Sequence, residues 1–180
     1  FIGPPLKDSF MEFYGFTGEE AERAVAVYRE RFAPVGIFEN QVYPGIPQML
    51  ERLYRRGTRL AVASSKPIGF VKQILAHFDI EKYFDVVVGS ELDGTRGTKE
   101  EVVEEALGRL GILTMPVTER HVRCAMTGDR KFDIQGARAC GLTGVGVRFG
   151  FAEEGELEEA GAEYIAETVA GLAEFLLRKA

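Results

Sequence analysis

The sequence predicts an α/β protein in which a parallel sheet is covered by helices on both faces, with a small helical region before it. From about residue 44 onward, short apolar runs alternate with amphipathic segments of helical period. These runs are apolar at successive positions, which is typical of parallel strands buried on both faces. Residues 1–43 carry helix signals and no clear strand pattern. The two regions together favour one sheet-based domain with a helical appendage.

The first 43 residues are expected to form helices. Thr17 and Glu20 have the spacing of a capping box, which marks a helix start. Apolar residues then recur at helical spacing: Ala21, Ala24, Val25, Tyr28 and Phe32. The turn-forming stretch 44–47 contains two prolines and a glycine, so we place a domain boundary near residue 44.

The remaining chain is expected to contain five strands separated by helices. The expected strands are residues 59–64, 84–89, 122–127, 144–149 and, as a short edge strand, 164–168. Gly57 and Gly111 follow two of the intervening helices and are candidates for left-handed caps.

Composition and charge limit the class of protein. The chain has 180 residues and a formal net charge of -6, which argues against a nucleic-acid partner. Cys124 and Cys140 are too few for a disulfide framework and favour a reducing, cytoplasmic location. No apolar run is long enough for a membrane span, and the first residues lack a signal-peptide pattern. We therefore expect a metabolic protein without membrane or nucleic-acid partners; the sequence carries no signal for oligomeric state.

Polar residues follow the first expected strand, at the sheet edge where ligands of open parallel sheets bind. Ser64 and Ser65 offer hydroxyls and backbone N–H groups at a strand-to-helix turn, which suits an anion. A simpler interpretation is that Ser65 caps the helix after it.

Lys99 lies at another such end, as the first residue of a helix that Thr98 and Glu101 open with a capping box. A cation there opposes the helix dipole unless a phosphate or a carboxylate cluster lies nearby. The simpler alternative is a solvated surface lysine.

Asp129 and Asp133 follow the third expected strand at i, i+4 spacing. Carboxylate oxygens with room for water suit Mg²⁺. Asp133 could instead cap the helix that ends at Gly141. A hydroxyl, a lysine and paired aspartates on successive strand ends are the components of phosphoryl transfer.

With these motifs in this order, the sequence resembles the haloacid dehalogenase-like hydrolases. The resemblance is to the branch with a helical cap that includes phosphoglycolate phosphatases and 5'-nucleotidase-like enzymes. RLAVASSKP (59–67) is similar to its second motif, Lys99 to its third, and GDRKFD (128–133) to its fourth, written GDxxxD. The first ten residues resemble the middle of the cap, and residues 146–172 resemble the C-terminal segment.

The resemblance implies a Rossmann-like core over residues 44–180 and a helical cap, of which residues 1–43 are the C-terminal part. It implies Mg²⁺-dependent hydrolysis of a small phosphorylated metabolite, such as phosphoglycolate or a nucleoside 5'-monophosphate, through an aspartyl-phosphate intermediate. In the implied roles, Ser64 bonds the transferring phosphoryl group, Lys99 neutralises charge, Asp129 holds Mg²⁺ and Asp133 supports it directly or through water. Ser65 and Lys7 would contact the substrate.

One family motif is missing. The family's nucleophile is the first Asp of a DxDGT motif that ends an N-terminal strand, and that strand lies between the strands of the second and fourth motifs. The only similar stretch, 91–95, has Glu91 in the nucleophile position and falls after the second motif. We therefore expect the 180 residues to be part of a longer phosphatase, lacking the core's first strand, and inactive by themselves.

Two other interpretations remain open at this point. Cys124 and Arg130 fit C-x5-R, the signature of cysteine-dependent phosphatases, although the residues after Cys124 continue an apolar strand. Alternatively, the chain is a non-catalytic Rossmann-like domain that binds phosphate or a partner without turnover.

Overall fold

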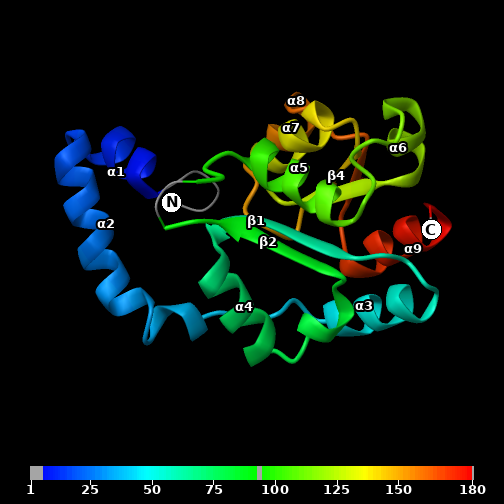
Figure 1. Cartoon of the computed structure of the whole chain (residues 1–180), viewed down its shortest axis with the longest axis horizontal. Coiled ribbons are helices and arrows are strands. Elements are labelled where there is room, and N and C mark those ends of the chain that lie inside the picture. The colour runs from blue at the N-terminus through cyan, green and yellow to red at the C-terminus, as the bar shows by residue number, and fades with distance from the viewer. Residues whose placement is uncertain (1–5, 93–94, 180) are drawn as a thin grey trace.

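The computed structural model describes residues 6–92 and 95–179, and the described chain forms parallel sheets flanked by helices, as predicted (Figure 1). A two-stranded sheet pairs β1 with β2, and a three-stranded sheet has the order β3-β4-β5. All of their pairings are parallel. The strands are β1 (Ala61–Pro67), β2 (Val86–Ser90), β3 (Ala125–Gly128), β4 (Thr143–Val147) and β5 (Tyr164–Ala166).

The helices lie on both faces of these sheets, with α1 and α2 apart at one side (Figure 1). The α-helices are α1 (Leu6–Tyr14), α2 (Gly18–Phe32), α3 (Ile46–Arg55), α4 (Ile68–His77), α5 (Lys99–Arg109), α6 (Val117–Arg123), α7 (Lys131–Ala139), α8 (Glu156–Glu159) and α9 (Val169–Lys179). Two short 3-10 helices are η1 (Gly36–Phe38) and η2 (Glu81–Tyr83). None of these described helices is both long and apolar enough to cross a bilayer.

The predicted helix ends are confirmed where local chemistry decides them. Thr17 and Thr98 each accept a backbone hydrogen bond in a complete capping box, at the start of α2 and α5. Gly57 and Gly111 follow α3 and α5 with φ of +80° and +69°, a conformation that glycine adopts without steric cost.

Helices, rather than strand pairing, join the two sheets. On one face, α3 contributes Leu50 to a core cluster with α4, and Leu53 to a cluster with β4, β5 and α9. On the other face, side chains of α5 and α7 pack together against Ala63 of β1 and Met126 of β3. Burial of these apolar side chains is therefore what holds β1–β2 beside β3–β5.

The facing edges of β1 and β3 are not paired with each other, and no described strand lies between them. All five residues of β4 are buried, whereas β1 and β3 contain no fully buried residue. A central strand of a parallel sheet is normally paired on both edges and buried. The described strands thus leave the facing edges of β1 and β3 unpaired, and the expectation that a shared neighbour is missing stays a prediction.

All five strands differ from their predicted bounds by one to three residues at one end or both, and the first and third differ most. The first strand continues through Ser64 to Pro67, because the residue before a proline favours extended backbone. Helix α4 then begins without a side-chain cap, so Ser65 is not its cap. In the expected strand 122–127, Val122 and Arg123 instead end α6, which follows Pro116. Val122 is 67% exposed, so its apolar character did not indicate burial.

Candidate active site

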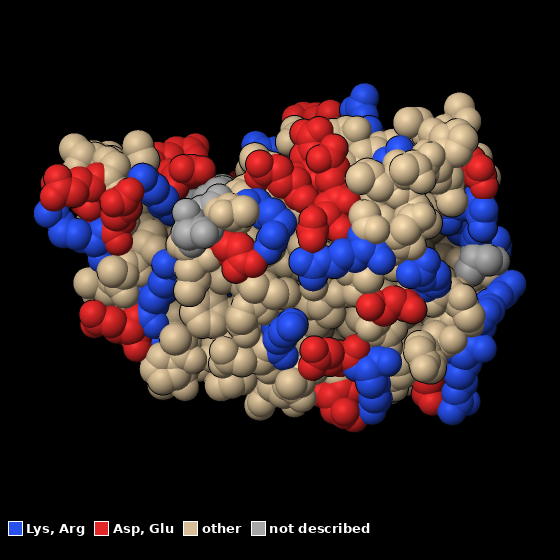
Figure 2. All heavy atoms as spheres, viewed as in Figure 1, with Lys and Arg blue, Asp and Glu red and all other residues tan. Residues whose placement is uncertain are grey.

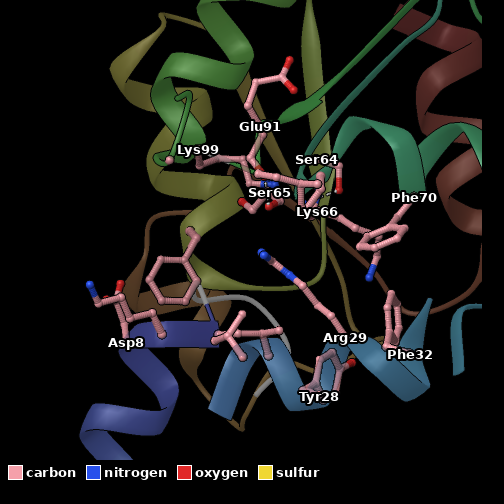
Figure 3. Close-up of a pocket in the computed structure, with 18 of the residues that line it drawn as sticks. Asp8, Tyr28, Arg29, Phe32, Ser64, Ser65, Lys66, Phe70, Glu91 and Lys99 are labelled. Carbon is pink, nitrogen blue, oxygen red and sulfur yellow. Dashed lines mark hydrogen bonds between the residues drawn. The ribbon is translucent and has the colours of Figure 1, made fainter. Parts of the chain in front are cut away.

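A cavity of about 970 Å³ lies between the helical pair α1–α2 and the carboxyl ends of β1, β2 and β3. Six of the residues that line it are those singled out from the sequence: Lys7, Ser64, Ser65, Lys99, Asp129 and Asp133. Figure 3 shows Ser64, Ser65 and Lys99 close together on the core side, facing residues of α2. The fold thus brings the predicted residues to one site, while their chemical roles stay predictions.

The serines lie in an irregular part of β1. The register to β2 shifts between Ser64 and Pro67, and Ser64 Oγ accepts a 3.2 Å hydrogen bond from Lys66 N–H. This bond uses a lone pair of Ser64, so its O–H proton is available to donate to an anion. Gly89 of β2 permits the irregularity, because a Cβ there would lie 2.5 Å from Lys66 O.

Lys99 and Asp133 form a largely buried ion pair. Lys99 Nζ lies 2.9 Å from Asp133 Oδ1, and the two side chains are 14% and 12% exposed. Lys99 Nζ also donates to Ala63 O at 3.3 Å, on the edge of β1 that faces β3. The Asp133 carboxylate compensates the unfavourable position of the Lys99 cation at the start of α5. The alternative interpretation of Lys99 as a solvated surface lysine is therefore wrong.

Asp129 is partly buried beside this pair. Its Oδ2 accepts a 3.1 Å hydrogen bond from Phe151 N–H. Burial raises the pKa of Asp129, Phe151 N–H partly offsets this, and repulsion from Asp133 raises it further. A cation near Asp129 would relieve this cost.

The residues present fit Mg²⁺ in their donor chemistry. Both oxygens of Asp133 are engaged, since Oδ1 faces Lys99 and Oδ2 accepts from Arg130 N–H at 3.1 Å, whereas the carboxylate of Asp129 makes no ion pair with a described residue. Asp129 is therefore the better direct ligand, and Asp133 the better support through water. Within residues 6–92 and 95–179, no group of three or more His, Cys, Asp or Glu side chains is arranged for a metal. Further ligands would be water or groups outside the described residues.

Three glycines leave room for the site side chains. A Cβ at Gly128 would lie 2.1 Å from Asp133 Cβ, at Gly150 2.2 Å from Asp129 Cβ, and at Gly136 2.6 Å from Lys99 Cγ. These separations are far inside van der Waals contact, so a larger residue at any of the three must displace a site side chain.

We expect Gly136→Ala to destabilise the protein by about 1–3 kcal/mol, because overpacking against Lys99 outweighs the helix propensity that alanine adds to α7. The matched control is Gly108→Ala in α5, where a Cβ would meet nothing within 4 Å. That variant should be stabilised by about 0.4–1 kcal/mol. Urea unfolding of both variants checks the difference, and equal stabilisation would contradict this packing argument.

We expect Asp129→Asn to raise Tm by a few degrees at pH 7 in EDTA. A raised carboxyl pKa means that the folded state binds the proton more tightly, so stability falls as pH rises through the usual aspartate range to the raised value. Asparagine removes that cost and can still accept from Phe151 N–H. The advantage should vanish as pH falls below about 4. Thermal unfolding from pH 4 to 8 tests this, and a lower Tm for the variant at pH 7 would show that the Phe151 hydrogen bond outweighs burial.

Lys7 lines the cavity with its ammonium already paired, and its role as a substrate contact stays a prediction. Its Nζ lies 2.6 Å from Glu22 Oε1, so it links α1 to α2 across the mouth of the cavity. Both side chains are exposed.

The structure adds residues that the sequence reasoning missed. Glu156 accepts from Arg130 Nε at 2.8 Å and from Lys131 N–H at 2.7 Å, with only 9% of its side chain exposed. It therefore fixes the loop between β3 and α7, although the acidic stretch 153–159 in which it lies carries no sequence signal for burial. Arg29 of α2 and Lys66 of β1 also line the cavity. Their signals in the sequence were the helical spacing of Arg29 with Phe32 and the place of Lys66 in the second motif.

The competing nucleophiles are poorly placed. Glu91 lines the cavity, but it pairs with Arg96, and Figure 3 shows its carboxylate directed away from Ser64 and Ser65. Two residues of the similar stretch, Asp93 and Gly94, lie outside the described residues. Cys124 precedes β3, at the opposite end from Asp129, and is not among the residues lining the cavity. Burial raises the pKa of its thiol, which disfavours the thiolate.

Figure 2 shows the charge around the site. Acidic side chains gather over α5 on the face drawn, and Lys and Arg are interspersed in smaller groups. A mixed surface of this kind carries no extended stripe of positive charge on that face.

A parallel α/β core with serine, lysine and paired aspartates at its strand ends is the arrangement of a phosphoryl-transfer hydrolase. The family model described as haloacid dehalogenase-like hydrolase matches residues 1–147, and the chain belongs to this family. The "5'-nucleotidase" of Pseudomonas aeruginosa is 45% identical over 157 residues, covering 87% of this chain and 68% of that protein.

Two further relatives differ in what they are called. A solved structure described as "a predicted phosphatase from Clostridium acetobutylicum" superposes with a TM-score of 0.90 at 45% identity, covering 98% of this chain and 78% of the other. The "Tyrosine-protein kinase PtkA" of Mycobacterium tuberculosis is 39% identical over 83% of this chain, which spans about half (48%) of that protein. Both phosphatase and kinase names therefore occur among relatives of similar identity.

Proposed function

We propose that the chain is the larger part of a Mg²⁺-dependent phosphatase that hydrolyses small phosphate monoesters in the cytoplasm. The observation that carries this proposal is the convergence of Ser64, Lys99 and Asp129 on one cavity beneath α1–α2. Residues 1–43 would act as the cap and residues 44–180 as the core. A nucleoside 5'-monophosphate and phosphoglycolate are both within this class, and the nucleotidase relative supports the former.

In the proposed mechanism, each described residue has a limited task. Ser64 donates its O–H to a nonbridging oxygen of the phosphoryl group, and Lys99 neutralises the charge that grows there. Asp133 holds the Lys99 ammonium at 2.9 Å, and Asp129 would hold Mg²⁺. The metal, when bound, would supply further charge neutralisation on the phosphoryl oxygens. Helices α1 and α2 would restrict the access of water to the cavity.

The nucleophile is proposed to come from a strand that fits between β1 and β3. Among the described residues their facing edges have no strand partner, and Ala63 O on β1 accepts from Lys99 instead. A parallel strand there would place its carboxyl end between Ser64 and Asp129. An aspartate at that end could attack the phosphorus, release the alcohol and then be freed by water.

The experiment uses a longer version of the protein that includes such a strand, with p-nitrophenyl phosphate as substrate. Activity should disappear in EDTA, return with added Mg²⁺, and survive alkylation of Cys124 and Cys140. Activity that resists EDTA and is lost on alkylation would overturn the proposal and favour Cys124. Binding of phosphate without turnover in every metal tested would favour the non-catalytic domain.

A further inference from the structure

The cavity contains cationic side chains that the proposed phosphoryl-transfer site does not use. Five cations line it: Lys7, Arg29, Lys66, Lys99 and Arg130. Three of them have a carboxylate partner, in the pairs Lys7–Glu22, Lys99–Asp133 and Arg130–Glu156. Arg29 and Lys66 have no ion pair with any residue in 6–92 or 95–179, although they lie on opposite sides of the cavity. The positive charges of Arg29 and Lys66 are therefore not neutralised by any carboxylate of the described residues.

Lys66 is held in a partly buried position. Its ammonium lies 4.7 Å from the ring centroid of Phe32, so a residue of β1 contacts a residue of α2. Burial lowers the pKa of Lys66, because water is removed from the ammonium without a carboxylate in exchange. A cation–π contact compensates only part of that loss.

Arg29 approaches the same region from α2. It precedes Phe32 by three residues, so the two side chains lie on the same face of the helix. Figure 3 shows its guanidinium directed across the cavity toward Ser65 and Lys99. Among the described residues, this guanidinium makes no hydrogen bond or ion pair, although it is only partly exposed. Asp8, an exposed acid of α1, lies away from it in the same view.

The aromatic residues beside these cations are already engaged. Tyr28 stacks on Phe32 with centroids 5.2 Å apart, Lys66 lies over the same ring, and Phe70 meets it edge-on at 5.4 Å. A ring covered in this way is not open for stacking a nucleobase. Phe32 therefore offers a ligand no free stacking surface, and the two cations beside it offer charge.

We propose that Arg29 and Lys66 form an anion subsite that binds a second anionic group, on the leaving group of the ester. This rests on the proposed function and narrows its substrate class to phosphate monoesters that carry a carboxylate or a second phosphate, which favours phosphoglycolate over a nucleoside 5'-monophosphate. Ser64 and Lys99 bind the transferring phosphoryl group, and the subsite lies between them and α2. A substrate with two anionic groups would bridge the core and α2, and thereby hold α2 over the site.

The test compares phosphoglycolate with ethyl phosphate, which has a methyl group in place of the carboxylate. In the strand-containing enzyme with Mg²⁺, kcat/KM should be at least about tenfold higher for phosphoglycolate. Arg29→Gln and Lys66→Met should each reduce that ratio about tenfold, and methionine keeps the contact with Phe32. The matched controls, Arg23→Gln on α2 and Lys72→Met on α4, replace exposed cations outside the cavity and should keep the ratio.

Calorimetric binding of both esters to the 180-residue chain gives a second readout that needs no turnover. It should show the same preference and the same loss in the two variants. A ratio near one in the parent, or an equal loss on both esters in the variants, would overturn the subsite. Absence of hydrolysis of either ester, with the binding preference intact, would instead overturn the proposed function and leave the subsite standing.

Discussion

The 180-residue chain is expected to hydrolyse p-nitrophenyl phosphate at least about 10⁴-fold more slowly than a version extended by a strand that carries an acidic nucleophile. Ser64, Lys99 and Asp129 can position and neutralise a phosphoryl group, but none of them is placed to accept it covalently. Their electrostatic contribution alone is worth far less than the covalent route. Steady-state kcat/KM of the two versions, measured side by side with Mg²⁺, provides the comparison.

The control for this prediction is the extended version with its nucleophilic aspartate replaced by asparagine. This variant should restore the strand but not the nucleophile, so its kcat/KM should match that of the 180-residue chain. It should also be more stable than that chain, because the added strand forms new backbone hydrogen bonds. Hydrogen exchange at β1 and β3 should slow in both extended versions, because the facing edges of these strands become paired. A short chain as fast as the extended one would contradict the prediction, and Glu91→Gln would then be the first variant to make.

The fold was predictable because its strongest signals are local. Apolar runs specified the five strands, and Thr98 with Glu101 specified the start of α5. The errors occurred where a local signal was ambiguous. Val122 is apolar yet lies exposed at the end of α6, and the serines were assigned to a turn although β1 continues to Pro67. That the strands of the second and fourth motifs would not pair with each other was expected from the family resemblance. The periodicity of the apolar runs gave no indication of it.

The site was predictable only for residues that follow strands. Ser64, Lys99 and Asp129 could be placed together because parallel strands end at one edge of the sheet. Arg29 and Glu156 could not, since each reaches the site through a contact distant in sequence. Glu156 pairs with Arg130, 26 residues earlier, and no pattern within the acidic run distinguishes it from its solvated neighbours.

Lys99→Met is expected to lower kcat of the extended enzyme by about 10²–10³-fold, because it removes the cation nearest the phosphoryl group's proposed position. It should also destabilise the protein by about 3 kcal/mol. Asp133, only 12% exposed, would keep its charge without its partner, and leaving one member of a buried pair uncompensated is costly. Rate measurements and urea unfolding read out the two effects separately.

The double variant Lys99→Met with Asp133→Asn separates catalysis from packing. Asparagine can still accept from Arg130 N–H through its side-chain oxygen and carries no charge, so much of the lost stability should return. The rate should stay low, because neutralising Asp133 does not replace the missing ammonium. Recovery of both stability and rate in the double variant would mean that Lys99 serves only to neutralise Asp133, and the role of Lys99 in phosphoryl transfer would have to be abandoned.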